Sequence, residues 1–457
     1  MKLTPPPLDI PENSPFQNDL FGREEFGNRL FNLITRLDEG LVMSINASWG
    51  EGKTSFVKMW AAFLRQKGSK CIYFDAFAQD YLDNAFIAIA SEISSLVDAE
   101  FEENQTPKTR LKEFKKKASK AGVKLLSWGA KVGVRAATLG AIKETDIEEL
   151  KEIKKIFAQD GSTLISDFIE SKLDNHKEDI KTIESFKKEL EILANEIKSE
   201  TNYPLIFIID EFDRCKPTYA LDLIEKIKHF FSVKNIIFVL VMNMAQLECS
   251  VRCLYGEDID ALTYLQKFIN IECQLPKNSD RHTSDQKKYC NYLYSAHQLN
   301  TWSDKEDLQD SMATFSEVLG LSFRDLEKCY SGLTLYYASI TENTFRISPI
   351  IAFLIILKIK FPPIYKKIKN NELSYEELIS RQELSAIFKS KEEESLIDFF
   401  TKWLKFLLIT EEQFNNLDEK DEIRDFSKSL FRYRIKRQEI ITIFCDSLDS
   451  FHLATDR

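Results

Sequence analysis

The chain has 457 residues, 44% of them hydrophobic and 29% charged, so it can form roughly two to four globular domains and is not disordered throughout. Its 62 basic and 72 acidic residues give a net charge of −10, which argues against a surface built wholly for nucleic acid. The low numbers of glycine (14) and proline (12), beside 34 phenylalanines, favour helices over a sandwich of short strands.

The first 18 residues are rich in proline and polar side chains, which predicts an extended arm. They contain no apolar run of the secretory type, and the longest fully apolar stretch of the chain, residues 350–357, is too short to cross a bilayer. That stretch follows Ser348 and Pro349 and is expected to be a buried core helix. We therefore expect a cytoplasmic protein without a transmembrane span, and contact with the membrane surface stays open.

Strand and helix patterns then alternate, which predicts a parallel sheet with helices on its faces. Short apolar runs bounded by turn residues are the expected strands, and longer amphipathic segments are the expected helices. We predict strands at 41–46, 70–75, 205–209, 235–242 and 268–274, and helices at 28–37, 54–66, 84–99, 218–230 and 260–267.

The first chemical motif, ASWGEGKTS at residues 47–55, lies between the first strand and its helix, the context that makes a Walker A match credible. Such a turn points backbone N–H groups at one spot, and the helix adds its positive end. Lys53 would contact the β- and γ-phosphates, and Thr54 would offer a hydroxyl to Mg²⁺. The predicted nucleotide-binding residues of this loop are Ser48, Trp49, Gly50, Glu51, Gly52, Lys53, Thr54 and Ser55. The alternative is a chance Gly-Lys-Thr at a helix start.

The second motif is a buried apolar strand, 206–209, that ends in two carboxylates. Asp210 is placed to serve Mg²⁺, and Glu211 to orient and deprotonate the attacking water. A strand cap or a solvated charge cluster is the alternative reading. The strand at 235–242 ends at Asn243, which would either sense the γ-phosphate or simply begin a turn.

Together these motifs resemble the KAP family of P-loop NTPases, a branch near the AAA+ and STAND ATPases. The likeness covers about residues 15–365, and its most specific part is DEFDRCKP at 210–217. The other matching segments are LFGRE at 20–24, WGEGKTS at 49–55, YFDAF at 73–77, YLQKF at 264–268 and SFRDLE at 322–327.

The resemblance implies an ASCE-type sheet with a helical lid, with ATP and Mg²⁺ as cofactors. It places Arg23 near the adenine and Arg324 of the lid against the γ-phosphate, and it suggests that Arg214 bridges subunits or supports the Walker B strand. Asn243 stands where the family usually has aspartate. Family members are often membrane-associated and, in bacteria, linked to the exclusion of phage and mobile DNA.

Residues 101–200 interrupt the α/β pattern with a helical insertion, at the place where the family often carries transmembrane helices. Within it, residues 108–143 hold eleven basic residues and one acidic residue, Glu113. If 120–141 is one helix, four glycines share a face opposite a basic edge. We hypothesise a packing hairpin or an oligomer seam, whose basic edge meets lipid headgroups, nucleic acid or an acidic partner. The alternative is a series of short turns with solvated lysines.

The predicted fold class is α/β, a parallel-sheet P-loop NTPase core interrupted by a helical insertion and followed by an all-helical lid and C-terminal region. The predicted divisions are an arm (1–18), a core in two parts (19–100 and 201–276), the insertion (101–200), a lid (277–361) and a C-terminal helical domain (362–457).

The leading functional hypothesis is Mg-dependent ATP hydrolysis that drives a switch or motor acting on a partner, in bacterial defence against phage or mobile DNA. The catalytic candidates are Glu211, Lys53, Arg324 and Asn243. A homo-oligomer, or a complex with other proteins of the same system, is the expected assembly. The alternatives are a nucleotide-gated scaffold or oligomerisation module with little turnover, and an ATPase that acts on nucleic acid.

Overall fold

In the part of the chain that the structure describes, five apolar segments form one parallel sheet in the order β2-β3-β4-β1-β5. The structure is a computed structural model, and it describes residues 1–457 except 38, 82–84, 104, 138–161, 279, 281–282, 390–393, 419–420, 432, 434 and 452–457. The strands are β1 (Leu41–Asn46), β2 (Cys71–Asp75), β3 (Leu205–Asp210), β4 (Ile236–Met242) and β5 (Ile271–Gln274). The additional strand β4 lies between β1 and β3, which carry the two phosphate-site motifs, so the expected ASCE-type sheet is confirmed.

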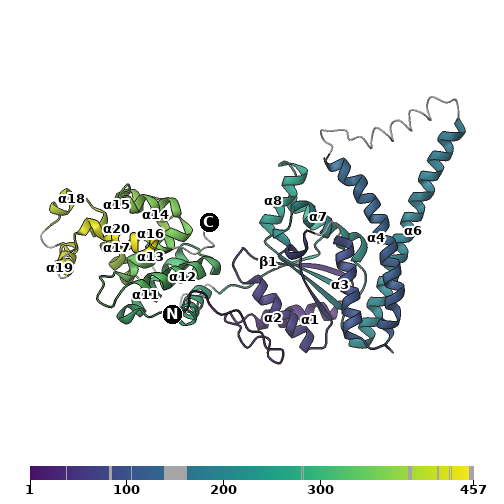
Figure 1. The fold of residues 1–457 in the computed structure, drawn as a ribbon, viewed down its shortest axis with the longest axis horizontal. Helices are drawn as coiled ribbons and strands as arrows, with labels where there is room; N and C mark the ends of the chain where they lie inside the picture. The colour runs from purple at the N-terminus through teal and green to yellow at the C-terminus, as the bar shows by residue number, and fades with distance from the viewer. Residues whose placement is uncertain are drawn as a thin grey trace.

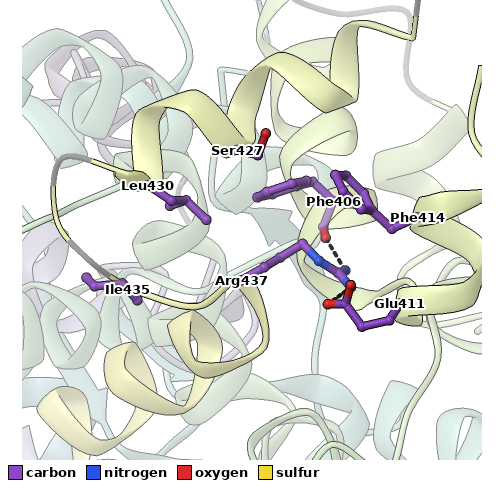
Figure 2. A pocket seen from close by; sticks show the side chains of 7 residues that line it. All are labelled: Phe406, Glu411, Phe414, Ser427, Leu430, Ile435 and Arg437. Carbon is purple, nitrogen blue, oxygen red and sulfur yellow. Dashed lines mark hydrogen bonds and ion pairs between the residues drawn. The ribbon is translucent and has the colours of Figure 1, made fainter. Parts of the chain in front are cut away.

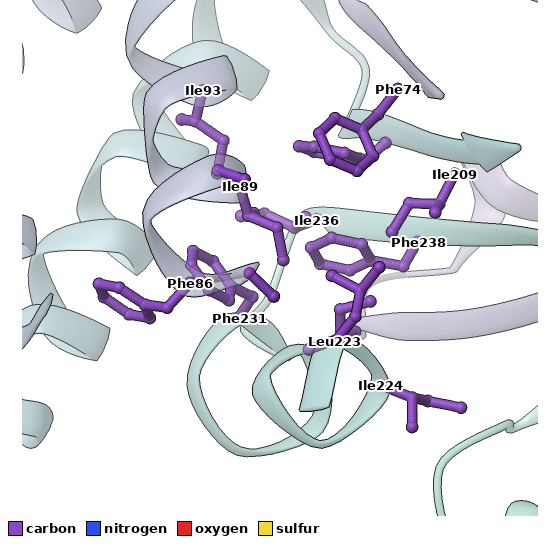
Figure 3. Close-up of a cluster of buried hydrophobic side chains, with 14 of the residues drawn as sticks. Phe74, Phe86, Ile89, Ile93, Ile209, Leu223, Ile224, Phe231, Ile236 and Phe238 are labelled. Carbon is purple, nitrogen blue, oxygen red and sulfur yellow. The ribbon is translucent and has the colours of Figure 1, made fainter. Parts of the chain in front are cut away.

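Each face of the sheet is covered by helices, because neighbouring side chains of a strand point to opposite faces and nearly all of them are apolar here. One face packs on α1 and α2. The other packs on α3, α7 and α8, and Figure 3 shows Phe74, Ile209 and Phe238 of the strands against side chains of α3 and α7. The helices of the core are α1 (Glu24–Arg36), α2 (Lys53–Gln66), α3 (Ala85–Glu100), α7 (Pro217–Lys226), α8 (Met244–Tyr255) and α9 (Ala261–Gln266).

Three elements have an end that lies three or four residues from its predicted position. Helix α1 begins four residues early because the Asp19 carboxylate accepts a hydrogen bond from the Glu24 amide at 2.9 Å. Strand β5 begins at Ile271, since the Phe268 amide still donates to a carbonyl of the preceding helix. The helix expected at 218–230 is α7 followed by a π-helical turn, Ile227–Phe231.

The insertion forms two long helices, α4 (Thr106–Ala137) and α6 (Ser162–Thr201), which lie side by side next to α3 at one end and diverge away from the core at the other (Figure 1). They run antiparallel, because Arg110 pairs with Glu196 whereas Lys117, further along α4, donates to Ser185. Residues 106–137 are therefore one helix rather than separate turns, and residues 138–141 of the predicted helix lie outside the described residues. No helix in the described ranges combines the length and apolar character needed to span a bilayer.

Everything after β5 is helical in the part of the chain that is described, and a single hydrophobic cluster runs through it from Cys290 to Leu448. At its centre lies α13, whose residues 348–357 are all buried, which confirms the predicted core helix. The predicted lid boundary at residue 361 falls inside this continuous cluster and stays a prediction. The helices are α10 (Asp285–Ala296), α11 (Lys305–Val318), α12 (Phe323–Ser339), α13 (Ser348–Lys360), α14 (Pro362–Lys369), α15 (Tyr375–Ile379), α16 (Ser385–Lys389), α17 (Glu394–Leu408), α18 (Glu411–Asn415), α19 (Phe426–Phe431) and α20 (Ile440–Asp449).

Candidate nucleotide site

The loop between β1 and α2 is built around two glycines in the left-handed region. Gly50 has φ 76° and Gly52 has φ 77°, values that other residues adopt only with strain. Lys53 opens α2, and its ammonium donates to the carbonyls of Ala47 (2.7 Å) and Ser48 (3.1 Å). Burial lowers the pKa of Lys53, since burial disfavours the charged form. The Lys53 ammonium therefore folds back onto its own loop and donates to two of the loop's backbone carbonyls.

The acidic pair at the end of β3 lies opposite this loop. Glu211, with φ 56°, accepts a hydrogen bond from the Thr54 hydroxyl (3.2 Å) and pairs with Arg214 Nε (2.6 Å). Burial raises the pKa of Glu211, and the charge of Arg214 opposes that rise. Asp210 is fully buried, and its two oxygens accept from the Glu211 amide and the Tyr73 hydroxyl, both at 2.8 Å. Both carboxylates are therefore held in fixed orientations.

Two predicted nucleotide-binding side chains are engaged by other protein groups. The indole of Trp49 donates to the carboxylate of Asp213, which links the phosphate loop to the segment after β3. The carboxylate of Glu51 pairs with Lys277 at 2.8 Å, at the start of the predicted lid. These side chains brace the loop in this structure, and their contact with nucleotide stays a prediction.

Arg23 lies beneath the loop, where it is 2% exposed. Its Nη1 donates to the carbonyls of Glu51 (3.1 Å) and Gly52 (3.5 Å), and its Nη2 lies 3.9 Å from the carboxylate of Asp285 in α10. Burial lowers the pKa of this guanidinium, and the nearby carboxylate of Asp285 opposes the shift. Arg23 therefore ties the loop to the first helix of the lid.

Helix α12 begins directly on the loop. The amide of Phe323 donates to the Gly50 carbonyl at 2.9 Å. A Cβ atom added to Gly50 would lie 2.8 Å from Ser322 Oγ and 3.1 Å from Arg324 Cβ. A capping box between Ser322 and Asp325 fixes the start of α12 and with it the position of Arg324. Arg346, another arginine of segment 277–361, is paired with Asp304 at 2.6 Å.

Two adjoining cavities surround these groups. The smaller, of 190 Å³, is lined by Lys53, Thr54, Glu211 and Arg324, so four predicted functional residues from three separate segments meet there. The larger, of 950 Å³, is lined by Arg23 and by the N-terminal arm. Gly52, Ser55, Phe21, Tyr289 and Glu327 line both cavities.

Asn243 is not among the described residues that line either cavity. It precedes α8, and its carbonyl accepts hydrogen bonds from Gln246 and Leu247. Its catalytic role stays a prediction. Tyr73 had no role assigned from sequence, although it begins the YFDAF segment, and Tyr289 of α10 carried no recognisable signal.

A further cavity, of 520 Å³, lies in the C-terminal region among α17, α18 and α19 (Figure 2). Its buried Arg437 donates to the carbonyls of Phe406 (2.7 Å) and Ile409 (2.6 Å) and pairs with Glu411 at 2.8 Å. These bonds satisfy the carboxyl end of α17. The Arg437 guanidinium therefore has a structural role. The cavity at the phosphate loop, by contrast, is lined by the candidate nucleotide-binding and catalytic residues.

The sequence matches a protein family whose description agrees with this geometry. The family model described as "KAP family P-loop domain" matches residues 23–416. Uncharacterized protein MJ0182 of Methanocaldococcus jannaschii is 31% identical over 176 residues, 36% of this chain and 84% of that protein. Two solved structures of the Aeropyrum pernix ORC2 protein, the ADPNP-ADP complexes and the ADP form, are each 12% identical with a TM-score of 0.34. The matches cover 94% of both chains in the first, and 98% of this chain and 96% of the other in the second.

Proposed function

The chain belongs to the KAP family of P-loop NTPases, and from this membership we propose that it hydrolyses ATP in the presence of Mg²⁺ and uses the reaction to move its lid. The observation that carries the proposal is the meeting of Lys53, Glu211 and Arg324 around one cavity although they come from α2, the end of β3 and α12. A chance Gly-Lys-Thr has no reason to face both an acidic pair and a lid arginine.

In this proposal the triphosphate is bound by backbone N–H groups of the loop and by the positive charge of Lys53. The loop amides and the amino end of α2 favour an anion, and the left-handed glycines allow it to approach. Lys53 then exchanges the carbonyls of Ala47 and Ser48 for phosphate oxygens, which are stronger partners for an ammonium.

The residues beside the loop fit magnesium, a hard cation that prefers oxygen ligands. The Thr54 hydroxyl and the carboxylate of Asp210 would supply such oxygens, and the bond of the Thr54 hydroxyl to Glu211 at 3.2 Å holds it beside the acidic pair. When bound, the metal would neutralise charge on the phosphates.

Glu211 is the proposed general base. Its raised pKa brings it closer to neutral pH and so makes it a better proton acceptor than an ordinary glutamate. It accepts one proton from water as the water oxygen bonds to the γ-phosphorus and the bond to the ADP oxygen breaks. Arg324 offers positive charge on the lid side of the cavity.

The direct bond between the Phe323 amide and the Gly50 carbonyl supports a switch, because a loop that rearranges around phosphate must move or release α12. The alternative of an ATPase that acts on nucleic acid depends on basic side chains of the insertion that are available to phosphates. Two of them, Lys108 and Lys115, instead pair with Asp98. A role in bacterial defence, together with a second copy or other proteins of the same system, is proposed from the family resemblance alone.

Phosphate release by wild type and by Glu211→Gln tests the proposal. We expect the variant to bind ATP and to lose turnover by about 10²- to 10⁴-fold, the range typical of general bases. Glu248→Gln is the matched control, because among the described residues Glu248 pairs within α8, with Arg252. Equal turnover in wild type and Glu211→Gln would remove Glu211 as the base, and absence of ATP binding by wild type would refute the assignment.

A further inference from the structure

The N-terminal arm is attached to the lid at its first residues. The Lys2 amide donates to the His297 carbonyl (2.7 Å), and the Lys2 carbonyl accepts from His297 Nδ1 (2.8 Å). The next carbonyl, of Leu3, accepts from the Ser331 hydroxyl at 2.9 Å. Both lid side chains are buried, and in Figure 1 the N-terminus lies beside α12. Residues 2 and 3 are therefore held between the end of α10 and the middle of α12.

The same arm is attached to the core a few residues later. The side-chain amide nitrogen Nε2 of Gln66, at the end of α2, donates to the Asn13 carbonyl at 2.7 Å. The ring of Phe16 is buried against Phe63 and Phe56, with centroids 5.7 and 6.3 Å away. Residues 2–16, which we call the strap, thus run from the lid to the core and are anchored at both ends.

Between its anchors the strap forms one wall of the 950 Å³ cavity, with residues 5–9. The opposite walls come from the start of α2 and from Tyr289 and Tyr292 of α10. A volume of this size suits a small-molecule ligand. Three consecutive prolines, at positions 5–7, restrict the strap backbone, so this wall loses little entropy when a ligand orders it.

The chemistry of this cavity suits a planar heterocycle. The rings of Tyr289 and Tyr292 stack with centroids 5.8 Å apart and supply the aromatic surface, whereas the Phe21 ring is already covered by Phe323 at 4.5 Å and by the Arg23 guanidinium at 4.7 Å. Aromatic faces and proline rings bind flat purines by stacking and exclusion of water. Since Gly52 lines both cavities, a ligand with its phosphates on the loop can extend its base and ribose under the strap.

We propose that strap residues 5–9 form the outer wall of the subsite for the purine base and ribose, and that His297 and Ser331 are positioning residues that hold this wall in place through Lys2 and Leu3. The inference rests on the proposed function. It adds one statement: the affinity for the base depends on the attachment of the strap to the lid. Affinity for the phosphates, which the loop itself provides, does not.

The test separates base from phosphates by comparing two probes, ATP and inorganic tripolyphosphate, in the full-length Glu211→Gln protein so that ATP is not consumed. One variant deletes residues 2–4, which removes all three bonds to the lid. A milder variant is Ser331→Ala, and its control is Ser295→Ala, whose hydroxyl donates to the Asn291 carbonyl in its own helix.

We expect the deletion to raise the Kd for ATP by about tenfold or more and Ser331→Ala to raise it by about three- to fivefold, as loss of buried hydrogen bonds implies. Tripolyphosphate affinity should stay within about twofold in both, which also shows that the loop remains folded. Unchanged ATP affinity would overturn the proposal, and so would an equal loss for both probes. If the Glu211→Gln protein with an intact strap binds neither probe, the proposed function falls, and the strap proposal with it.

Discussion

Replacing Gly50 by alanine probes the contact between the phosphate loop and the lid. The left-handed φ of 76° costs an alanine about 1–2 kcal/mol. The added Cβ would also lie 2.8 Å from Ser322 Oγ and 3.1 Å from Arg324 Cβ, whereas ordinary contacts are 3.4 Å or longer. The start of α12 must therefore retreat by a few tenths of an ångström, and Arg324 retreats with it. Because a misplacement of about 1 Å can cost about 10²-fold in rate, we expect a shift of a few tenths of an ångström to lower the ATPase kcat/KM by about three- to tenfold.

Gly68→Ala is the matched control for this variant. Gly68 has φ 88° and follows α2 in the same core, but a Cβ there meets nothing within 4 Å. Backbone strain should lower the free energy of unfolding of both variants, and the contact with Ser322 should lower that of Gly50→Ala further, as measured by chemical denaturation. Only Gly50→Ala should lose activity, measured by phosphate release. Equal activity in the two variants would refute the argument that the lid acts through this contact.

Two more predictions concern the acidic pair. Tyr73→Phe removes the hydroxyl that donates to one oxygen of the buried Asp210, so the free energy of unfolding should fall by about 1–3 kcal/mol. The control Tyr81→Phe, at a position 71% exposed, should leave the free energy of unfolding unchanged. Equal free energies of unfolding in the two variants would refute this reasoning. Burial raises the pKa of Glu211, so kcat/KM should fall as pH drops through that raised value. Arg214→Ala removes the positive charge that opposes the rise in the Glu211 pKa, so the acidic limb of the pH–rate profile should move to higher pH. If the acidic limb does not move, a group other than Glu211 controls it.

The sheet and the phosphate loop could be predicted from sequence because their signals are local. A parallel strand buried on both faces is a continuous apolar run, as in β1 and β4, and the loop motif needs only its neighbouring strand and helix for context. Glu211 was predictable for the same reason, since it directly follows a buried strand. Each of these features is encoded within fewer than twenty residues.

The contacts that could not be predicted join segments far apart in the chain. Nothing near Gly50 indicates that the amide of Phe323 will bond to it, and nothing in the proline-rich arm indicates that residues 2 and 3 will meet α10 and α12. Trp49 and Glu51 were assigned to nucleotide because they lie within the loop motif. Tertiary structure gives them partners, Asp213 and Lys277, that spacing alone does not reveal.

These long-range contacts couple the position of the predicted lid to the conformation of the phosphate loop. The loop is joined to the segment 277–361 by the bond of Gly50 to Phe323, by the ion pair of Glu51, and through Arg23 to Asp285. The Lys53 bonds to the loop carbonyls are the ones that phosphate would replace. Because those carbonyls belong to the same short loop as Gly50 and Glu51, a change in lysine partners alters the geometry on which the lid contacts depend. We therefore expect occupancy of the phosphate site to be transmitted to α12 directly, without an intermediary element.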